Sequence, residues 1–381
     1  MKKLFSVIAG IGVFVLIICG FKLHMNAAIE MHAAGVHNHR TYERFWSRDA
    51  QKHIIEDDTL VVFGSSELVP LSDMDENISS FLNGDDMNIV TMGSGNFQSL
   101  SHTMTLGAIS DYISAKKVAL FLSPQWFVQN GVDAAAFPAR MSEDELLGFL
   151  NNSKISDEHK DYVLDRAVAL LEGSPAQLKR VQRYQNAHRN KLTLDTIYFK
   201  VMNQYWRFRS EFEIYKQLDE VNDDVPVYNL SKMDFEKILQ KAELQGKKAC
   251  TNNDFGINDE YWNTYAKEKF DEGEILEKSQ VFTESIEYSD LDCFLDVAKE
   301  LGIEVLLVCI PVNERWYTYK GLLCDEYYHK IANVAADHEN VTFIDMSEFA
   351  GEKYFLKDVM HLGWKGWTRI NERLYQEFTK Q

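Results

Sequence analysis

Cysteine is scarce in this sequence, and its spacing carries no recognisable chemistry. The 381 residues include five cysteines, none in a Cys-x-x-Cys pair and none spaced with histidines as zinc ligands are. This excludes a redox motif and a structural metal site, and we expect neither a metal nor another cofactor. Cys250, Cys293 and Cys324 could form one bridge outside the cytoplasm, but we predict no essential disulfide bond.

Positive charge is also in short supply. With 40 basic against 58 acidic residues the formal net charge is -18, which excludes a general nucleic-acid surface because phosphate binding needs a concentrated positive field. One basic cluster has roughly helical spacing, and we interpret it first as a solvated helix face and second as a patch for an anionic substrate. Its members are Lys179, Arg180, Arg183, Arg189 and Lys191.

Only one apolar run is long enough to span a membrane. Lys2 and Lys3 precede residues 4–21, which carry no charge and would rise about 27 Å as a helix, near the lower limit for a hydrocarbon core. We predict a retained anchor rather than a cleaved signal peptide, because the run is long and a poor cleavage site follows it. The two lysines place the N-terminus in the cytoplasm and residues beyond about 25 outside the cell membrane.

Short apolar segments that open into small or polar loops predict the strands. Thr59–Phe63, Asn88–Met92 and Val118–Leu122 come first, and residues 99–114 between the last two have helical periodicity, which is the βαβ pattern of a parallel sheet. Glu304–Ile310 and Val341–Asp345 follow near the C-terminus. The predicted fold class is α/β, a flavodoxin-like parallel sheet of about five strands with helices on both faces.

A helical region interrupts this pattern for roughly 150 residues. Five helices are predicted in it: Glu143–Leu150, Asp157–Leu171, Pro175–Asn190, Leu194–Leu218 and Lys232–Leu244. Nearer the C-terminus, one helix should cover residues 290–301 and a final helix should run from Gly366 to about Phe378. We therefore divide the chain into a cytoplasmic stub and anchor (1–24), a linker and extension (25–57), two parts of a catalytic domain (58–140 and 286–381) and a large helical insertion between them (141–285).

Ser66 is the predicted nucleophile. It follows the strand Thr59–Phe63 and a Gly-Ser turn, and a serine hydroxyl needs a base and a third group that orients the base. Among eleven histidines only His361 has a suggestive context, because Asp358 stands three residues before it in a predicted loop. Neither motif is specific alone. Their joint placement past strands of one α/β unit predicts a triad of Ser66, His361 and Asp358.

The chain resembles a known hydrolase group in these motifs. Gly64-Ser65-Ser66, a glycine loop after the second strand and Asp358-x-x-His361 are similar to the SGNH (GDSL-type) plan, although Ser65 stands where those enzymes carry Asp and their Gly-x-Asn-Asp block is missing. Over essentially the full length the chain resembles the DltD family more closely. The motifs are Phe63-Gly-Ser-Ser-Glu-Leu68, Ser123-Pro-Gln-Trp-Phe127, Pro311-Val-Asn-Glu-Arg-Trp-Tyr317 and Asp358-x-x-His361-x-Gly-Trp364.

This resemblance implies D-alanylation of teichoic acid, including lipoteichoic acid, in the Gram-positive cell wall. The implied partners are a membrane-bound O-acyltransferase (DltB), the D-alanyl carrier protein (DltC) and the polymer as acceptor. Glu67 could then receive the cationic amine of a D-alanyl group, but we favour a first-turn acid stabilised by the helix dipole.

An oxyanion hole is the least determined part of the predicted site. The backbone N–H groups of Ser66 and of Gly93 or Gly95 can supply two of the donors that stabilise a developing negative charge. Because the asparagine of the missing block is absent, the side chain of Gln125 or Asn96 is our candidate for a third. An equal interpretation of Gln125 is a loop amide that caps its own backbone.

Three functions fit these residues. The first is a serine acyltransferase that carries D-alanine as an ester on Ser66, the second an esterase or thioesterase with the same triad, and the third a non-catalytic scaffold. Transfer and hydrolysis share the acyl-enzyme and differ in whether water is excluded. We favour transfer, because an anchor holds the site close to a membrane-embedded donor.

Overall fold

Five parallel strands form one sheet in the described part of the chain. The computed structural model describes residues 2–38, 47–68, 78, 84–190, 194–224, 227–271, 284–313 and 322–380. The strands are β1 (Thr59–Phe63), β2 (Asn88–Met92), β3 (Lys117–Leu122), β4 (Glu304–Cys309) and β5 (Val341–Asp345). Each begins and ends within one residue of its predicted bounds. The α/β fold class is confirmed.

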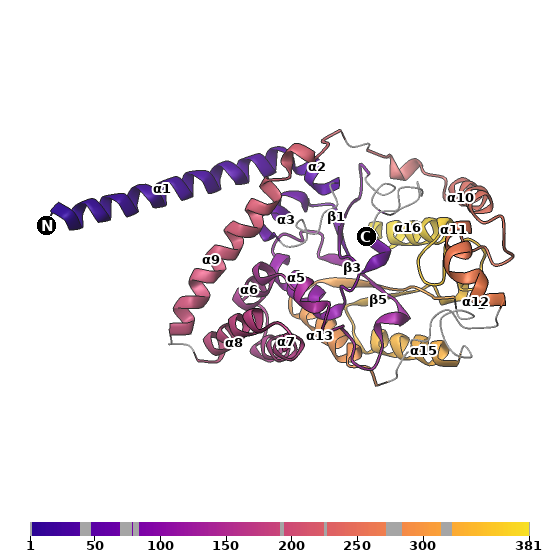
Figure 1. Ribbon diagram of the computed structural model, residues 1–381. Coiled ribbons are helices and arrows are strands. Elements are labelled where there is room, and N and C mark those ends of the chain that lie inside the picture. The colour runs from indigo at the N-terminus through magenta and orange to yellow at the C-terminus, as the bar shows by residue number, and fades with distance from the viewer. Residues whose placement is uncertain are drawn as a thin grey trace.

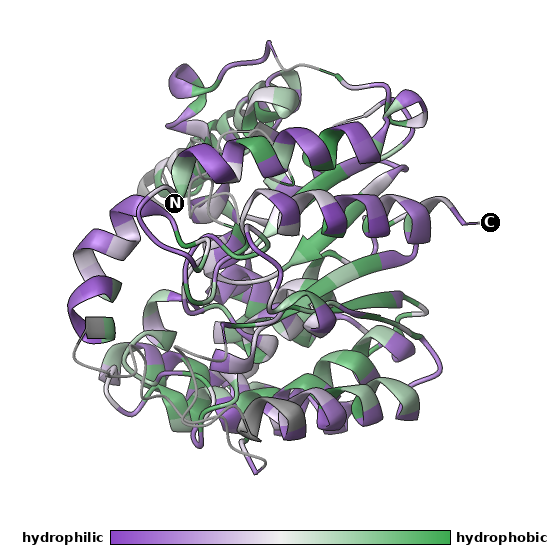
Figure 2. Ribbon diagram, turned by 90° about the vertical axis from the view of Figure 1, so that its right-hand side faces the viewer, coloured by the Kyte–Doolittle hydropathy of each residue, from purple (hydrophilic) through white to green (hydrophobic). Residues whose placement is uncertain are grey.

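All of β1 and most of β2, β3 and β4 are buried, because both faces of the sheet are covered there. In β1, Val61 and Phe63 pack into one hydrophobic core, and Leu60 and Val62 pack into a second core on the opposite face. All five residues of β1 are buried. Parallel strands between helical layers read as continuous apolar runs for this reason. Figure 2 shows green strands between helices whose exposed faces are largely purple.

The strand order β2-β1-β3-β4-β5 fixes where a site can lie. The chain passes from β1 to β2 on one side and returns to β3 on the other, so the direction of winding reverses between β1 and β3. In open α/β sheets, ligands bind beyond the carboxyl ends of the strands at such a switch point. Ser66 follows β1 by three residues and therefore belongs to this edge.

Helices cover both faces of the sheet. On the face with Val61, the core contains residues of α5 (Ser99–Ile109), α13 (Glu287–Glu300) and α15 (Leu322–Asp337). On the other face, α10 (Phe235–Ala249) packs against α16 (Trp364–Thr379). The sequence predicted all of these helices except α15.

The predicted helices that follow β3 are also present. They are α6 (Glu143–Asn151), α7 (Asp157–Leu170), α8 (Pro175–Arg189) and α9 (Leu194–Tyr215). Ser142 caps α6 by accepting a hydrogen bond from the Glu145 N–H at 3.2 Å. Helix α6 packs on α5, and α9 contacts α6 and α8 (Figure 1). Shorter helices are α2 (Ala33–Asn38), α3 (Arg48–Ile54), α11 (Asp259–Tyr261) and α12 (Lys267–Asp271).

An apolar helix projects from the N-terminal side of the molecule. Helix α1 (Lys2–Met31) includes a 27-residue segment, Phe5–Met31, that is long and apolar enough to cross a membrane. Figure 1 shows most of α1 extending away from the sheet. Met25 and Ile29 near its C-terminal end are fully buried, so the last turns pack on the rest of the protein. This helix is compatible with a single-pass anchor.

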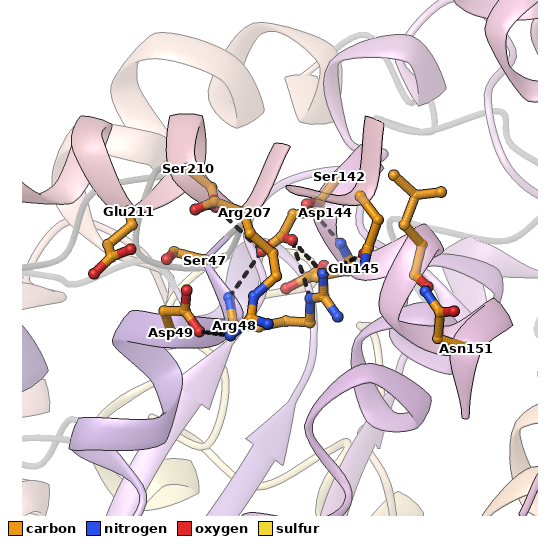
Figure 3. A network of polar contacts seen from close by, with 12 residues as sticks. Ser47, Arg48, Asp49, Ser142, Asp144, Glu145, Asn151, Arg207, Ser210 and Glu211 are labelled. Atoms are coloured by element: carbon orange, nitrogen blue, oxygen red, sulfur yellow. Dashed lines mark hydrogen bonds and ion pairs between the residues drawn. The ribbon is translucent and has the colours of Figure 1, made fainter. Parts of the chain in front are cut away.

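A network of charges ties the base of α1 to the domain. Figure 3 shows the part of this network that comes from α3, α6 and α9. The guanidinium group of Arg48 donates to Asp144 at 2.7 and 3.0 Å, and the Arg48 backbone N–H donates to the same carboxylate at 3.1 Å. Lys22 of α1 binds Asp49 at 3.0 Å and Glu211 of α9 at 3.3 Å. Charged side chains of four helices, α1, α3, α6 and α9, therefore meet at one place.

Replacing Asp144 by alanine should destabilise the protein strongly. The Arg48 side chain is 11% exposed, and removal of its partner leaves a buried charge uncompensated, which costs about 3–5 kcal/mol. The matched control is Asp111→Ala, because Asp111 pairs with Lys154 where both side chains are more than half exposed, and such pairs contribute about 1 kcal/mol or less. Thermal unfolding of the full chain in detergent measures the stability of both variants. An equal loss of stability in the two would contradict the role of the network.

Candidate functional site

Ser66 sits on a turn that several hydrogen bonds hold in place. The Gly64 N–H donates to the Met92 carbonyl at the end of β2 at 3.2 Å. The Ser65 hydroxyl donates to the Ser94 carbonyl at 3.3 Å. Ser66 then begins a single 3-10 turn, Ser66–Leu68. These contacts join the loops after β1 and β2 and fix the backbone that carries the Ser66 hydroxyl.

His361 and Asp358 meet Ser66 across the carboxyl edge of the sheet. The Ser66 Oγ lies 3.0 Å from the His361 Nε2. The His361 Nδ1 lies 2.9 Å from the Asp358 Oδ2. Asp358 Oδ1 also accepts the backbone N–H groups of Met360 and His361 at 2.9 and 2.8 Å. One carboxylate thus shapes the loop and orients the ring that faces Ser66.

The two ionisable partners shift each other's pKa in opposite directions. Burial acts to lower the pKa of His361, but the hydrogen bond and negative charge of Asp358 outweigh burial and raise that pKa above its ordinary value. Burial acts to raise the pKa of Asp358, but His361 and the two backbone N–H groups bring it below its ordinary value. Asp358 therefore stays ionised near neutral pH and stabilises a protonated His361.

Gly93 allows the two loops to approach each other. Its φ is +145°, and a Cβ at this position would lie 1.9 Å from the Gly64 carbonyl oxygen. Gly95 lies beside Ser66, because an ideal Cβ there would be 4.0 Å from the Ser66 Cβ. The structure therefore places Gly95 next to Ser66, and Gly93 next to Gly64, two residues before it. Their part in an oxyanion hole remains a prediction.

The two amides predicted as a third donor lie in different settings. Asn96 is exposed and has φ +69°, a left-handed conformation that asparagine tolerates better than most residues. Gln125 is half-buried in the short turn Pro124–Trp126, directly after β3. Trp126 in that turn and Trp364 at the start of α16 are both 2% exposed, so they are packing residues.

Glu67 is engaged with the backbone of the turn. Its carboxylate accepts the Ser65 N–H at 2.6 Å, and its side chain is buried. Burial raises the pKa of Glu67, while the N–H groups of Ser65 and Glu67 and the charge of His361 act in the opposite direction. This contact braces the turn, and recognition of a D-alanyl amine by Glu67 remains a prediction.

Two residues near Ser66 escaped the sequence analysis. His102 of α5 is 1% exposed among the rings of Phe63, Phe97 and Trp126, and it hydrogen-bonds to the Gly64 carbonyl. Burial lowers the pKa of His102 to about 3, so the ring is neutral.

The second is Arg140, whose Nε donates to the Gly95 carbonyl at 2.6 Å. His102 supports the loop after β1 and Arg140 supports the loop after β2. Neither His102 nor Arg140 stands in a recognisable sequence motif, so their contacts with the site become visible only in the folded structure.

A cavity of about 450 Å³ lies on the Asp358 side of the site. Its lining includes Asp358, Asn313, Asp254 and Phe255. Asn313 is the last described residue of the motif Pro311–Tyr317, and residues 314–317 lie outside the described residues. The Asn313 N–H donates to the Val359 carbonyl at 2.8 Å. The described part of this motif therefore borders the loop that carries Asp358 and His361.

The arginines of the basic cluster predicted from the sequence form ion pairs with neighbouring carboxylates and do not present an unpaired basic surface. Arg180 binds Glu143, Arg183 binds Asp195, and Arg189 binds Asp161 and Asp165. Lys191 lies outside the described residues. The helix-face interpretation explains the three arginines better than the interpretation as an anion patch.

The fold and the candidate site together narrow down the family of this chain. A doubly wound parallel sheet carries, at its carboxyl edge, a Ser–His–Asp chain of hydrogen bonds between residues of opposite ends of the sequence. The family model described as "DltD protein" matches residues 39–379. The chain belongs to the DltD family.

Curated relatives agree with this assignment. The chain is similar to Protein DltD of Bacillus subtilis (strain 168), with 27% identity over 350 residues covering 87% of this chain and 85% of the relative. It is 26% identical to Protein DltD of Staphylococcus aureus (strain NCTC 8325 / PS 47), over 82% of this chain and 79% of the relative. For Protein DltD of Lacticaseibacillus rhamnosus the identity is 25%, over 81% and 75%.

Alanine at Gly93 should strain the site loops. The positive φ and the contact with Gly64 should together cost about 2–4 kcal/mol of unfolding free energy. Gly173→Ala is the matched control, because nothing lies within 4 Å of a Cβ at that position. Thermal unfolding of both variants in detergent measures the difference. A Gly93→Ala variant as stable as the control would rule out this close approach of the loops.

Proposed function

We propose that the chain is a serine acyltransferase that transfers D-alanine to teichoic acid outside the cytoplasm. Proteins of the DltD family function in teichoic-acid D-alanylation. The observation that carries the proposal is the contact of 3.0 Å between Ser66 Oγ and His361 Nε2, with Asp358 at 2.9 Å behind the ring. This is the arrangement that activates a serine hydroxyl.

The first half-reaction forms an ester on Ser66. His361 Nε2 takes the Ser66 proton while Oγ attacks the carbonyl carbon of an activated D-alanyl group, and the oxyanion forms near the N–H groups of Ser66 and Gly93 or Gly95. The carbonyl reforms as the bond to the donor's oxygen or sulfur breaks. His361 then returns the proton to this leaving atom.

The second half-reaction passes the ester to the polymer. A hydroxyl of the teichoic-acid chain gives its proton to His361 and attacks the Ser66 ester carbonyl. The bond to Ser66 Oγ breaks, and Oγ regains a proton from His361. The products are the D-alanyl ester of the polymer and the free Ser66 hydroxyl, so no cofactor is consumed.

Helix α1 supports a place in the cell membrane for this reaction. We propose that residues 1–24 form the cytoplasmic stub and anchor, and that residues 58–140 and 286–381 form the catalytic domain outside, with 141–285 as its insertion. Such an anchor would hold Ser66 near a membrane-bound O-acyltransferase (DltB) as donor partner, with the D-alanyl carrier protein (DltC) acting on the other side.

Hydrolysis is the second candidate. The His361 side chain is 29% exposed and Ser66 is half-buried, so water can reach the site in this state. An esterase or thioesterase would use the same acyl-enzyme and release free D-alanine. A non-catalytic scaffold would form no acyl-enzyme at all.

Ser66→Ala and His361→Ala should each lower teichoic-acid D-alanylation in cells by about a thousandfold or more, because each removes a member of one catalytic unit. Ser65→Ala is the matched control, since it keeps the nucleophile and loses one hydroxyl contact of 3.3 Å. D-Alanine ester content of the polymer is the measurement. Full activity in Ser66→Ala or in His361→Ala would exclude the proposed triad.

Intact-mass analysis separates the three functions. Protein isolated with its donor system should gain the mass of one alanyl unit, and Ser66→Ala should lose that gain. Release of free D-alanine without a polymer acceptor would favour hydrolysis. Absence of any adduct together with normal D-alanylation by Ser66→Ala would favour the scaffold.

The pH dependence of Ser66 reactivity should show that Asp358 controls the protonation of His361. Neutral His361 is the base, so reactivity falls as pH drops through the His361 pKa, which Asp358 raises above its ordinary value. Asp358→Asn should slow the reaction and move this acid limb to lower pH. The rate of Ser66 labelling by a fluorophosphonate across the pH range measures both effects; an unmoved limb would contradict the assignment of His361 as base.

A further inference from the structure

Helix α9 carries a stripe of large apolar side chains that the described part of the chain leaves uncovered. We call Leu194, Ile197, Val201 and Tyr205 the α9 stripe; they are 81%, 62%, 60% and 47% exposed. Their spacing of three and four residues places them on one face of the helix. A contiguous apolar surface of this kind marks an interaction site.

The α9 stripe continues directly into the contact with the apolar helix α1. The next positions on the same helical face are Phe208, Phe212 and Tyr215. Their ring centroids lie 6.2, 6.1 and 5.8 Å from that of Phe21. One apolar surface therefore runs from Phe21 of α1 along the whole length of α9.

Charges lock the angle between the two helices. Lys22, directly after Phe21, binds Glu211 of α9 at 3.3 Å and Asp49 of α3 at 3.0 Å. Arg207 of α9 binds the same Asp49. From this junction, Figure 1 shows α9 and α1 both running away from the sheet toward the same side of the molecule. A bilayer that contains α1 would meet α9 on that side.

The side chains along the stripe suit the interface of a bilayer. Exposed Lys200 and Arg209 flank the apolar positions, and long basic side chains can reach lipid headgroups while their stems stay in an apolar layer. The opposite face of α9 packs on α6 and α8. This makes α9 an amphipathic helix with one face on protein and the other open to lipid.

We infer that the α9 stripe lies in the outer interface of the cell membrane, in contact with lipid acyl chains, as a second membrane attachment beside α1. The inference rests on the anchor of the proposed function and is independent of the acyl-transfer chemistry. Two attachments at a fixed angle hold the carboxyl edge of the sheet in one orientation to the membrane, which one flexible span cannot do.

Photocrosslinking of the full-length protein tests this attachment. Benzoylphenylalanine replaces Val201, Val13 in α1 or Leu244 in α10, one position at a time, and each protein is reconstituted in vesicles of phosphatidylglycerol and cardiolipin. Leu244 is the matched control, because it is an aliphatic side chain with 59% exposure on α10, which covers the other face of the sheet from α9 (Figure 1). All three side chains are solvent-accessible, so folding is preserved.

The expected result is a lipid adduct at Val201 in a yield comparable to Val13 and at least about tenfold above Leu244. A yield at Val201 no higher than at Leu244, with Val13 labelled, would overturn the second attachment and leave the anchor and the acyl transfer standing. An unlabelled Val13 would overturn the anchor and this inference together. In cells, an adduct of Val201 with a membrane protein instead of lipid would also overturn it.

Discussion

The hydrogen bond between Ser66 and His361 joins two residues that lie 295 positions apart, and the rest of the architecture serves to make that contact possible. Ser66 follows the strand at the switch point of the sheet, and His361 comes from a loop after the last strand. Parallel pairing sends every carboxyl end to the same edge, so the order of the strands decides which loops can meet. The proposed chemistry therefore depends on the register of the whole sheet.

Local bonds then reduce the freedom of each partner. On one side Gly93 lets the loop after β2 touch the Gly64 carbonyl, and Glu67 binds the Ser65 N–H. On the other side Asp358 binds the backbone of its own loop as well as the His361 ring. A site held this way has little reorganisation to undergo when charge develops, which is the main source of electrostatic stabilisation in catalysis.

Sequence alone predicted the sheet well because strands buried on both faces leave an unmistakable apolar run. It also predicted that Ser66, Asp358 and His361 lie together, since Ser66 follows a predicted strand and Asp358 stands three residues before His361. Their catalytic roles stay a prediction. The sequence did not predict α15, whose apolar positions are mixed with Tyr, His and Asp. It could not assign His102 or Arg140 to the site, because their contacts with Gly64 and Gly95 exist only after the chain has folded. Long-range contacts of this kind have no signature in local spacing.

The partial exposure of His361 bears on the choice between transfer and hydrolysis. A site that water can reach will favour transfer only when the acceptor hydroxyl arrives faster than water, either because a bound partner closes the site or because the acceptor is concentrated beside it. The proposed confinement to a membrane surface would supply the second condition. A fixed orientation through α1 and α9 would strengthen it, because the Ser66 ester would face the acceptor rather than sample all directions. If both proposals hold, the apolar surfaces of α1 and α9 act together with Ser66, His361 and Asp358. Selectivity for transfer would then come from where the domain is held as much as from the residues around Ser66.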